Sequence, residues 1–173
     1  NFYTDYITNP EGGFVDPYII DASKAPVFRK MSEAKKRGDE FLVNCEEGKE
    51  LEETYRQLTK AGEKQFKGLL DSGFSFPTKQ YEHVVFGAKV SLLFITYEPV
   101  PGAHDIFKRF GKVFEQTYTR FLDLQKAESQ ARESQIQLAL ERVRARTMAM
   151  QKSDELPEAA NLLFQQVQSL GMP

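Results

Sequence analysis

Apolar side chains recur at three- and four-residue steps in two stretches of the first part of the chain, and this spacing predicts two amphipathic helices. The first helix is expected to begin at Pro26 and end at Gly38, because proline fits a first helical turn and glycine fits a helix end. Its apolar stripe is Val27, Phe28, Met31 and Ala34. The second is expected over residues 51–70, as one helix of about five turns. Its apolar face consists of Leu51, Tyr55, Leu58, Phe66, Leu69 and Leu70.

Alternating or continuous apolar runs predict short strands around these helices. The expected strands are residues 14–20, 41–43, 82–86 and 90–97, with a turn at residues 9–13. Pro17 restricts the first strand to the edge of a sheet. The last two strands flank Gly87-Ala88 and form a hairpin. In the final strand Leu92 and Phe94 face one way while Leu93 and Ile95 face the other, so we expect this strand to be central in its sheet and covered on both sides.

One long helix is predicted to start near His104, because no glycine or proline occurs from residue 112 to residue 156. Its early stripe is wide and aromatic and is expected to pack on the sheet: Ile106, Phe107, Phe110, Val113, Phe114, Tyr118, Phe121 and Leu122. Further along, the stripe narrows to a seam with alternating steps of four and three, which is typical of a coiled coil. The register of the seam is offset by one residue between Arg132 and Ile136, and this predicts a local change of winding.

The segment 125–151 has too few apolar residues to be buried inside a monomer, and a lone helix of this kind is only marginally stable in water. A second copy of the helix solves both problems, so the sequence predicts a parallel homodimeric coiled coil that serves as a signalling connector. The expected dimer interface is Leu124, Ala131, Ile136, Leu140, Val143, Thr147 and Met150. A solvated single helix is the alternative. Arg142, Arg144 and Arg146 alternate around the helix and are interpreted as solvated flanks, not as a nucleic-acid patch.

A further helix is expected over residues 154–170, with Pro157 in its first turn and Gly171 at its end. Its predicted apolar face is Leu156, Ala160, Leu163, Phe164, Val167 and Leu170. Nothing follows that this face could pack on, so the helix is interpreted as the opening of another domain. One hypothesis places it on a neighbouring chain, where it replaces an opening helix that the first domain lacks.

Composition limits the class of protein. The 173 residues are 40% hydrophobic and 28% charged, which fits one folded domain and a remainder. The net charge of −2 argues against a globally basic nucleic-acid binder. One cysteine and two histidines exclude a zinc finger, a disulfide scaffold and a three-histidine metal centre. No apolar run approaches the roughly 20 residues that cross a bilayer, and no signal peptide is visible, so no direct membrane insertion and a cytoplasmic location are expected. The missing initiator methionine suggests a piece of a larger chain.

Few residues are candidates for chemistry. Residues 37–41, Arg-Gly-Asp-Glu-Phe, resemble the signature of diguanylate cyclases, but a helix end, a loop and a strand start explain them better, and the upstream metal and phosphate segments are missing. His104 is expected to cap a helix or lie on the surface, and His83 lies on a strand. Cys45 is expected to be a buried or inert thiol. The sequence therefore predicts no catalytic residue and no metal ligand, and it names no cofactor.

Residues 94–101, 103–110 and 120–128 resemble a module of large bacterial sensory proteins, especially of the Bacteroidetes type, in which long helices join GAF-like domains. Residues 138–150 resemble the linker before such a domain, and residues 153–171 resemble its first helix. The resemblance implies a mixed sheet with helices on its faces, a small-ligand or interaction pocket, and an output module such as a histidine kinase or a nucleotide cyclase. It also implies that the domain is truncated before Phe14.

The sequence thus predicts an α+β fold in three parts: a GAF-like sensor domain over residues 1–124, a coiled-coil linker over 125–151, and the first helix of a following domain over 152–173. The expected function is a non-enzymatic sensory fragment of a signal-transduction protein, of the kind found in two-component systems. It would relay the signal of a small-molecule ligand or a partner through a dimeric helix to a distant output. A nucleotide-cyclase fragment and a ligand-free dimerisation module are the alternatives.

Overall fold

The computed structural model describes residues 2–8, 14–71, 73 and 75–172. The chain is α+β, with two small antiparallel sheets and one long helix, as the sequence predicts. It divides into two compact units, Asn1–Tyr118 and Thr119–Pro173, and each is described by itself. The predicted turn at residues 9–13 lies outside the described residues.

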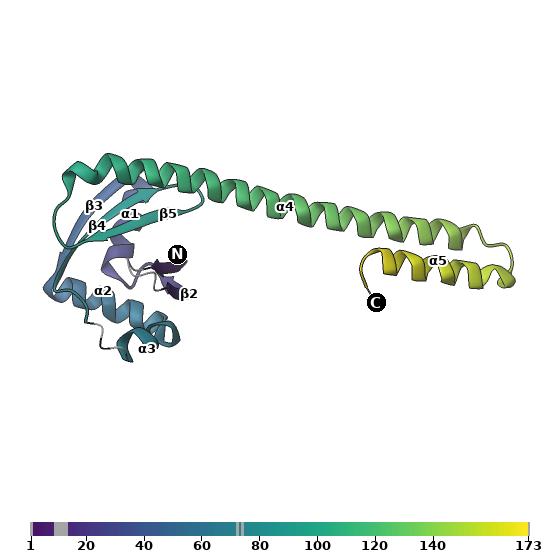
Figure 1. The fold of residues 1–173 in the computed structure, drawn as a ribbon, viewed down its shortest axis with the longest axis horizontal. Coiled ribbons are helices and arrows are strands. Elements are labelled where there is room, and N and C mark those ends of the chain that lie inside the picture. The colour runs from purple at the N-terminus through teal and green to yellow at the C-terminus, as the bar shows by residue number, and fades with distance from the viewer. Residues whose placement is uncertain (1, 9–13, 72, 74, 173) are drawn as a thin grey trace. The chain divides into compact units, whose positions relative to one another are not determined.

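The first unit contains most of the elements (Figure 1). In chain order they are β1 (Phe2–Thr8), β2 (Phe14–Asp21), α1 (Pro26–Arg37), β3 (Phe41–Glu47), α2 (Gly48–Ala61), α3 (Glu63–Asp71), β4 (Lys79–Phe86), β5 (Ser91–Thr96) and a 3₁₀ turn, η1 (Pro101–Ala103). Helix α4 (His104–Met148) begins in this unit and continues into the second, which adds the 3₁₀ turn η2 (Ser153–Glu155) and α5 (Leu156–Ser169).

The predicted first helix is confirmed as α1. Proline occupies its first turn, and Gly38 ends it in the left-handed region with φ of 86°, where glycine has no steric penalty. The predicted stripe of Val27, Phe28, Met31 and Ala34 is buried. The α1 boundaries and the buried face follow from these local signals alone.

The prediction of one helix over residues 51–70 is wrong, because the chain forms α2 and α3 with a break at Gly62. A Cβ atom at this position would lie 3.0 Å from the Tyr18 ring and 3.1 Å from the Phe66 ring. The break lets Phe66 pack edge-on against Tyr18, with ring centroids 5.5 Å apart. Leu51, Leu58 and Phe66 are buried as predicted.

The predicted strands and the hairpin are confirmed as β2 to β5, whereas β1 was missed. Strand β5 is not central as predicted: the order is β3-β4-β5, so β4 is the central strand and β5 pairs only with β4 among the described residues. Every described strand pairing is antiparallel, so the mixed sheet that the resemblance implies is not found.

The register of the three-stranded sheet separates its side chains into two faces. One face carries Asn44, Glu46, Gln80, Glu82 and Val84 and points to the helices α1 and α2. The core on this side is formed by the following buried residues: Tyr18, Ile20, Ala22, Ala25, Val27, Phe28, Met31, Leu58, Phe66 and Val84. The opposite face carries Phe41, His83, Val85 and Phe94 and is covered by the first turns of α4.

Helix α4 is one α-helix of 45 residues, and it continues through residues 132–136 without a break. The prediction that the whole aromatic stripe packs on the sheet is wrong. Phe107 stacks on Phe94 with centroids 4.5 Å apart, whereas Phe110 and Val113 are 63% and 60% exposed. The stripe is wider than the contact with the sheet, so its outer half remains in solvent.

In the second unit, the C-terminal part of α4 and α5 form an antiparallel hairpin (Figure 1). Ala139 and Ala159 are buried in this unit, and the Arg132 guanidinium donates to the carbonyl of Leu170. Helix α5 therefore packs on α4 of the same chain, whereas the sequence analysis found nothing after it on which its apolar face could pack. Leu163 and Phe164, from its predicted apolar face, are exposed instead.

Candidate functional site

A hollow of about 430 Å³ lies beside α2 in the first unit. Its volume is within the range of small-molecule sites. One wall is formed by residues that recur along one face of α2, and the other by the segment that leads into β4; the lining is Gly48, Glu52, Tyr55, Arg56, Thr59, Phe76, Pro77 and Thr78. The Tyr55 and Phe76 rings stack with centroids 4.1 Å apart. This hollow is a candidate for the pocket that the resemblance implies.

Tyr55 connects the hollow to a chain of polar side chains inside the domain. Its hydroxyl donates to Gln80 Oε1 at 2.5 Å, and Gln80 Nε2 donates to Glu82 Oε1 at 2.8 Å. Glu82 Oε2 accepts from Asn44 Nδ2 at 2.7 Å, and Asn44 Oδ1 accepts from Lys30 Nζ at 3.0 Å. The connected groups therefore come from both helices that cover the sheet and from two of its strands.

Two carboxyl groups are fully buried in this network. Burial, with the charge of Glu46 adding to it, raises the pKa of Glu82 to about 7, although the amides of Gln80 and Asn44 act in the opposite direction. Burial also raises the pKa of Glu46, against the lowering effects of Thr54 and Lys30. Glu82 accepts one amide hydrogen bond on each oxygen, whereas neither Glu46 oxygen has a hydrogen-bond partner of normal geometry among the described residues. An ionised Glu46 would be poorly solvated, so we infer that the pair holds a proton near neutral pH.

The other face of the sheet holds a cluster of rings that contacts α4. His83 is buried, and its ring lies 5.3 Å from His104 and 5.1 Å from Phe107, measured between centroids. The Thr96 hydroxyl gives its proton to the carbonyl of Glu98, so His83 Nε2 is the donor in the 3.0 Å contact with Thr96 Oγ1. Burial, assisted by His104, lowers the pKa of His83, which fits the neutral ring. His104, at the junction of η1 and α4, is half-buried in this cluster, so it is not the surface residue that was one of the two expectations.

Two further residues position α4 on the sheet, and the sequence analysis assigned neither. A Cβ atom at Gly111 would lie 2.3 Å from Val85 Cγ1, so only glycine allows this approach of helix and strand. The Glu115 carboxylate accepts from the backbone N–H groups of Lys89 and Val90, at 2.9 and 3.2 Å. A glycine inside an apolar helical stripe was the signal that could have indicated the first contact.

The minor candidates are placed as follows. Gly38 ends α1, Asp39 pairs with Arg37, and Phe41 begins β3, so the helix-end explanation of residues 37–41 is confirmed. Cys45 is exposed, so burial, one of the two expectations for this thiol, is wrong. Among the described residues, no group of three histidine, cysteine, aspartate or glutamate side chains could hold a metal ion.

The predicted dimer residues do not lie on one face of α4. At 100° per residue, Leu124 and Leu140 point in directions about 160° apart. Ile136, Val143 and Met150 are half-buried in the unit that holds α5, whereas the remaining four are exposed: Leu124, Ala131, Leu140 and Thr147. Exposed apolar residues of α4 in the first unit instead form one stripe, called the α4 stripe here: Ile106, Phe110, Val113 and Phe114.

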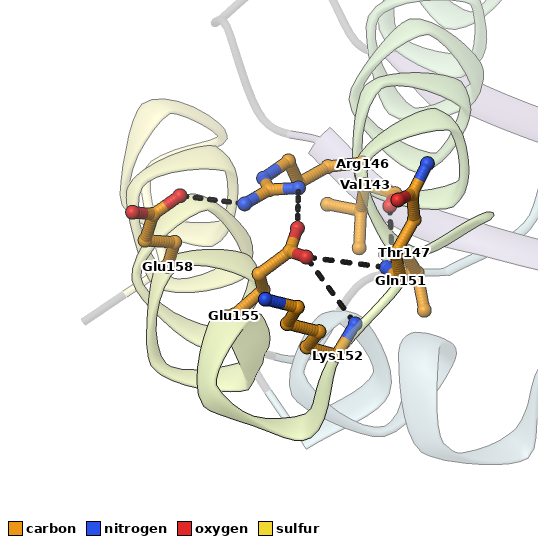
Figure 2. Close-up of polar contacts among 7 residues, drawn as sticks. All are labelled: Val143, Arg146, Thr147, Gln151, Lys152, Glu155 and Glu158. Atoms are coloured by element: carbon orange, nitrogen blue, oxygen red, sulfur yellow. Dashed lines mark hydrogen bonds and ion pairs between the residues drawn. The ribbon is translucent and has the colours of Figure 1, made fainter. Parts of the chain in front are cut away.

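The connection between α4 and α5 is held by ionic contacts, which Figure 2 shows. Arg146 donates to Glu155 at 3.1 Å and to Glu158 at 2.5 Å. The second Glu155 oxygen accepts from the backbone N–H groups of Gln151 and Lys152, at 3.2 and 3.3 Å (Figure 2). Glu155 therefore caps the start of the turn and orients α5 at the same time.

No family model matches the chain, and neither curated proteins nor solved structures provide a significant match. Among the described residues, no helix is long and apolar enough to cross a membrane.

Proposed function

We propose that the protein is a cytoplasmic sensory module, with a GAF-like domain that binds a small ligand or a partner and α4 as a dimeric connector to an output module. In this proposal the chain has no catalytic role of its own. The observation that carries the proposal is the α4 stripe: a helix that begins against the sensor sheet also presents exposed apolar side chains along its outer face. Such a stripe favours a protein partner.

The hollow beside α2 is the proposed ligand site. A ligand that moves Tyr55 would disturb its hydrogen bond to Gln80 and, through Glu82, the central strand β4. On the opposite face of that strand, Val85 contacts Gly111 of α4. The sensor pocket and the connector helix thus share one strand, which supports a relay by a small movement of α4.

The dimer is tested by sedimentation equilibrium of the full chain. Phe110→Glu places a charge in the α4 stripe and is expected to raise the dissociation constant at least about tenfold, since like charges would meet across a two-fold axis. Gln116→Glu adds the same charge to an exposed position outside the stripe and is the matched control. A wild-type chain that remains monomeric at millimolar concentration would contradict the proposal.

The relay is tested by hydrogen exchange. Tyr55→Phe removes the hydroxyl that Gln80 accepts and is expected to speed amide exchange in β4 and in the first turns of α4. Tyr6→Phe, at an exposed tyrosine on β1, is the matched control. If only the amides of α2 respond to Tyr55→Phe, the proposed route from the hollow to α4 is wrong. A thermal-shift screen of metabolites then searches for the ligand itself.

A further inference from the structure

The two helices of the hairpin present most of their uncovered apolar residues on the same side. Ala139 and Arg146 of α4 contact α5, and Ala159 and Gln166 of α5 contact α4. On each helix, the residue that follows a contact position is rotated about 100° around the helix axis from the contact. Because the two helices are antiparallel, these rotations bring the following residues of both helices to the same side of the pair. These following residues, with their apolar neighbours, form the hairpin face: Leu140, Thr147, Leu156, Ala160, Leu163 and Phe164.

The opposite side of the hairpin has a different character. It holds a groove of about 220 Å³ lined mainly by polar residues: Gln135, Leu138, Ala139, Arg142, Gln166, Ser169 and Leu170. The Arg142 guanidinium contacts Gln166 Oε1 there at 3.3 Å. The hairpin is therefore amphipathic as a unit, with one apolar and one polar side.

We infer that the hairpin face is covered by the same face of a second copy of the chain, so that two hairpins form a four-helix bundle. This inference rests on the proposed self-association and names a second surface for it. Four of its side chains, Leu140, Leu156, Leu163 and Phe164, are about half exposed. They leave roughly 400 Å² of apolar surface per chain, about half of the ~800 Å² that each partner buries in a standard interface. Polar rim residues account for the remainder in such interfaces.

The charge pattern favours a second copy over other occupants. No charged residue occurs from Ala159 to the end of the sequence, and depletion of charge is typical of the core of a protein interface. A helix that lies on a lipid surface carries Lys and Arg on its polar face, and α5 has neither. A face related to itself by a two-fold axis is self-complementary when it is apolar and uncharged.

The hairpin face is distinct from the α4 stripe, because the stripe belongs to the first unit and the hairpin face to the second. The two surfaces can therefore be disrupted separately. This separation allows an experiment in which failure of the four-helix bundle differs from failure of the proposed connector.

The test measures thiol protection in the full chain. Cys45→Ser removes the exposed native thiol, and Leu163→Cys then places a thiol in the hairpin face, while Leu138→Cys places one on the polar side. The parent side chains are matched, at 48% and 54% exposed. On going from dilute to concentrated protein, the rate of labelling by a disulfide reagent is expected to fall at least about tenfold at position 163 and less than about twofold at position 138. Leu163→Glu is expected to raise the dissociation constant at least about tenfold with unchanged helicity.

Equal protection at the two positions would overturn the inference. The inference would also be overturned if the thiol at position 163 is unprotected in a chain that sediments as a dimer and becomes monomeric on Phe110→Glu. That result would support the proposed connector and exclude the four-helix bundle. A chain that is monomeric at every concentration overturns both.

Discussion

Glu46→Gln tests the buried carboxyl pair. The substitution keeps the shape of the side chain and removes one of two acidic groups from the core. Burial raises the pKa of Glu82 from 4.5 to about 7, with Glu46 contributing. In this window the folded protein retains a proton that the unfolded chain has released, so the free energy of unfolding of the wild type falls as the pH rises from about 4.5 to about 7. A shift of this size corresponds to about 3 kcal/mol, reached in full only above the folded pKa.

The variant is expected to lose part of this pH dependence. Its amide can donate to Glu82, and the charge of Glu46 is gone, so the pKa of Glu82 should fall, while burial still keeps it above its ordinary value. The expected free energy of unfolding exceeds that of the wild type by about 1–3 kcal/mol at pH 8, and the difference approaches zero near pH 4.5, where both carboxyls are protonated. His83, whose lowered pKa acts in the opposite direction, is present in both proteins and cancels in the difference.

The assay is urea unfolding followed by far-ultraviolet circular dichroism at several pH values between 4.5 and 8, since the chain contains no tryptophan. Glu52→Gln, at an exposed carboxylate of α2, is the matched control and should change stability by less than about 0.5 kcal/mol at each pH. A stabilisation that does not vary with pH, or a Glu46→Gln protein that is less stable than the wild type at pH 8, would refute the shared proton.

Two further substitutions test how α4 is held at each end. Gly111→Ala should lower the free energy of unfolding, measured in urea, by about 1–3 kcal/mol, because the new methyl group overlaps Val85 and this outweighs the helix preference of alanine. Gly102→Ala is the control and should be close to neutral, because nothing lies near its added methyl group. If Gly111→Ala is stabilising, the close approach of helix and strand is wrong. Glu155→Ala removes the backbone cap and a partner of Arg146, and it should destabilise the packing of α5 by about 1 kcal/mol. The expected result is faster hydrogen exchange in α5 only, and unchanged exchange in α5 would exclude the role of Glu155.

The buried network shows where sequence patterns mislead. Glu46 and Glu82 are carboxylates, which are seldom buried, and the sequence analysis assigned neither of them to the core. The register of β3 and β4 and the cover of α1 and α2 enclose them instead. Amide donors from Asn44 and Gln80 make the burial of Glu82 tolerable, and these donors come from positions that only the folded sheet brings together.

The sequence predicted the elements whose ends are set by residues adjacent in the chain. Pro26 and Gly38 bound α1, Gly87 lies in the turn of the hairpin, and η1 precedes α4 at the predicted start, because proline and glycine act on their own backbone angles. The placement of residues 37–41 at a helix end has the same local origin. The resemblance to sensory proteins and the dimer remain proposals.

Amino-acid sequence alone determined that this chain has amphipathic helices, a hairpin and a long helix with an apolar stripe. Only the tertiary structure decided which part of that stripe packs on the sheet. It placed the break at Gly62, moved β5 to the sheet edge, divided the aromatic stripe between the sheet and solvent, and seated α5 on α4. The physical reason is that periodicity specifies which residues share a face, whereas the partner of each face depends on packing between segments distant in the sequence.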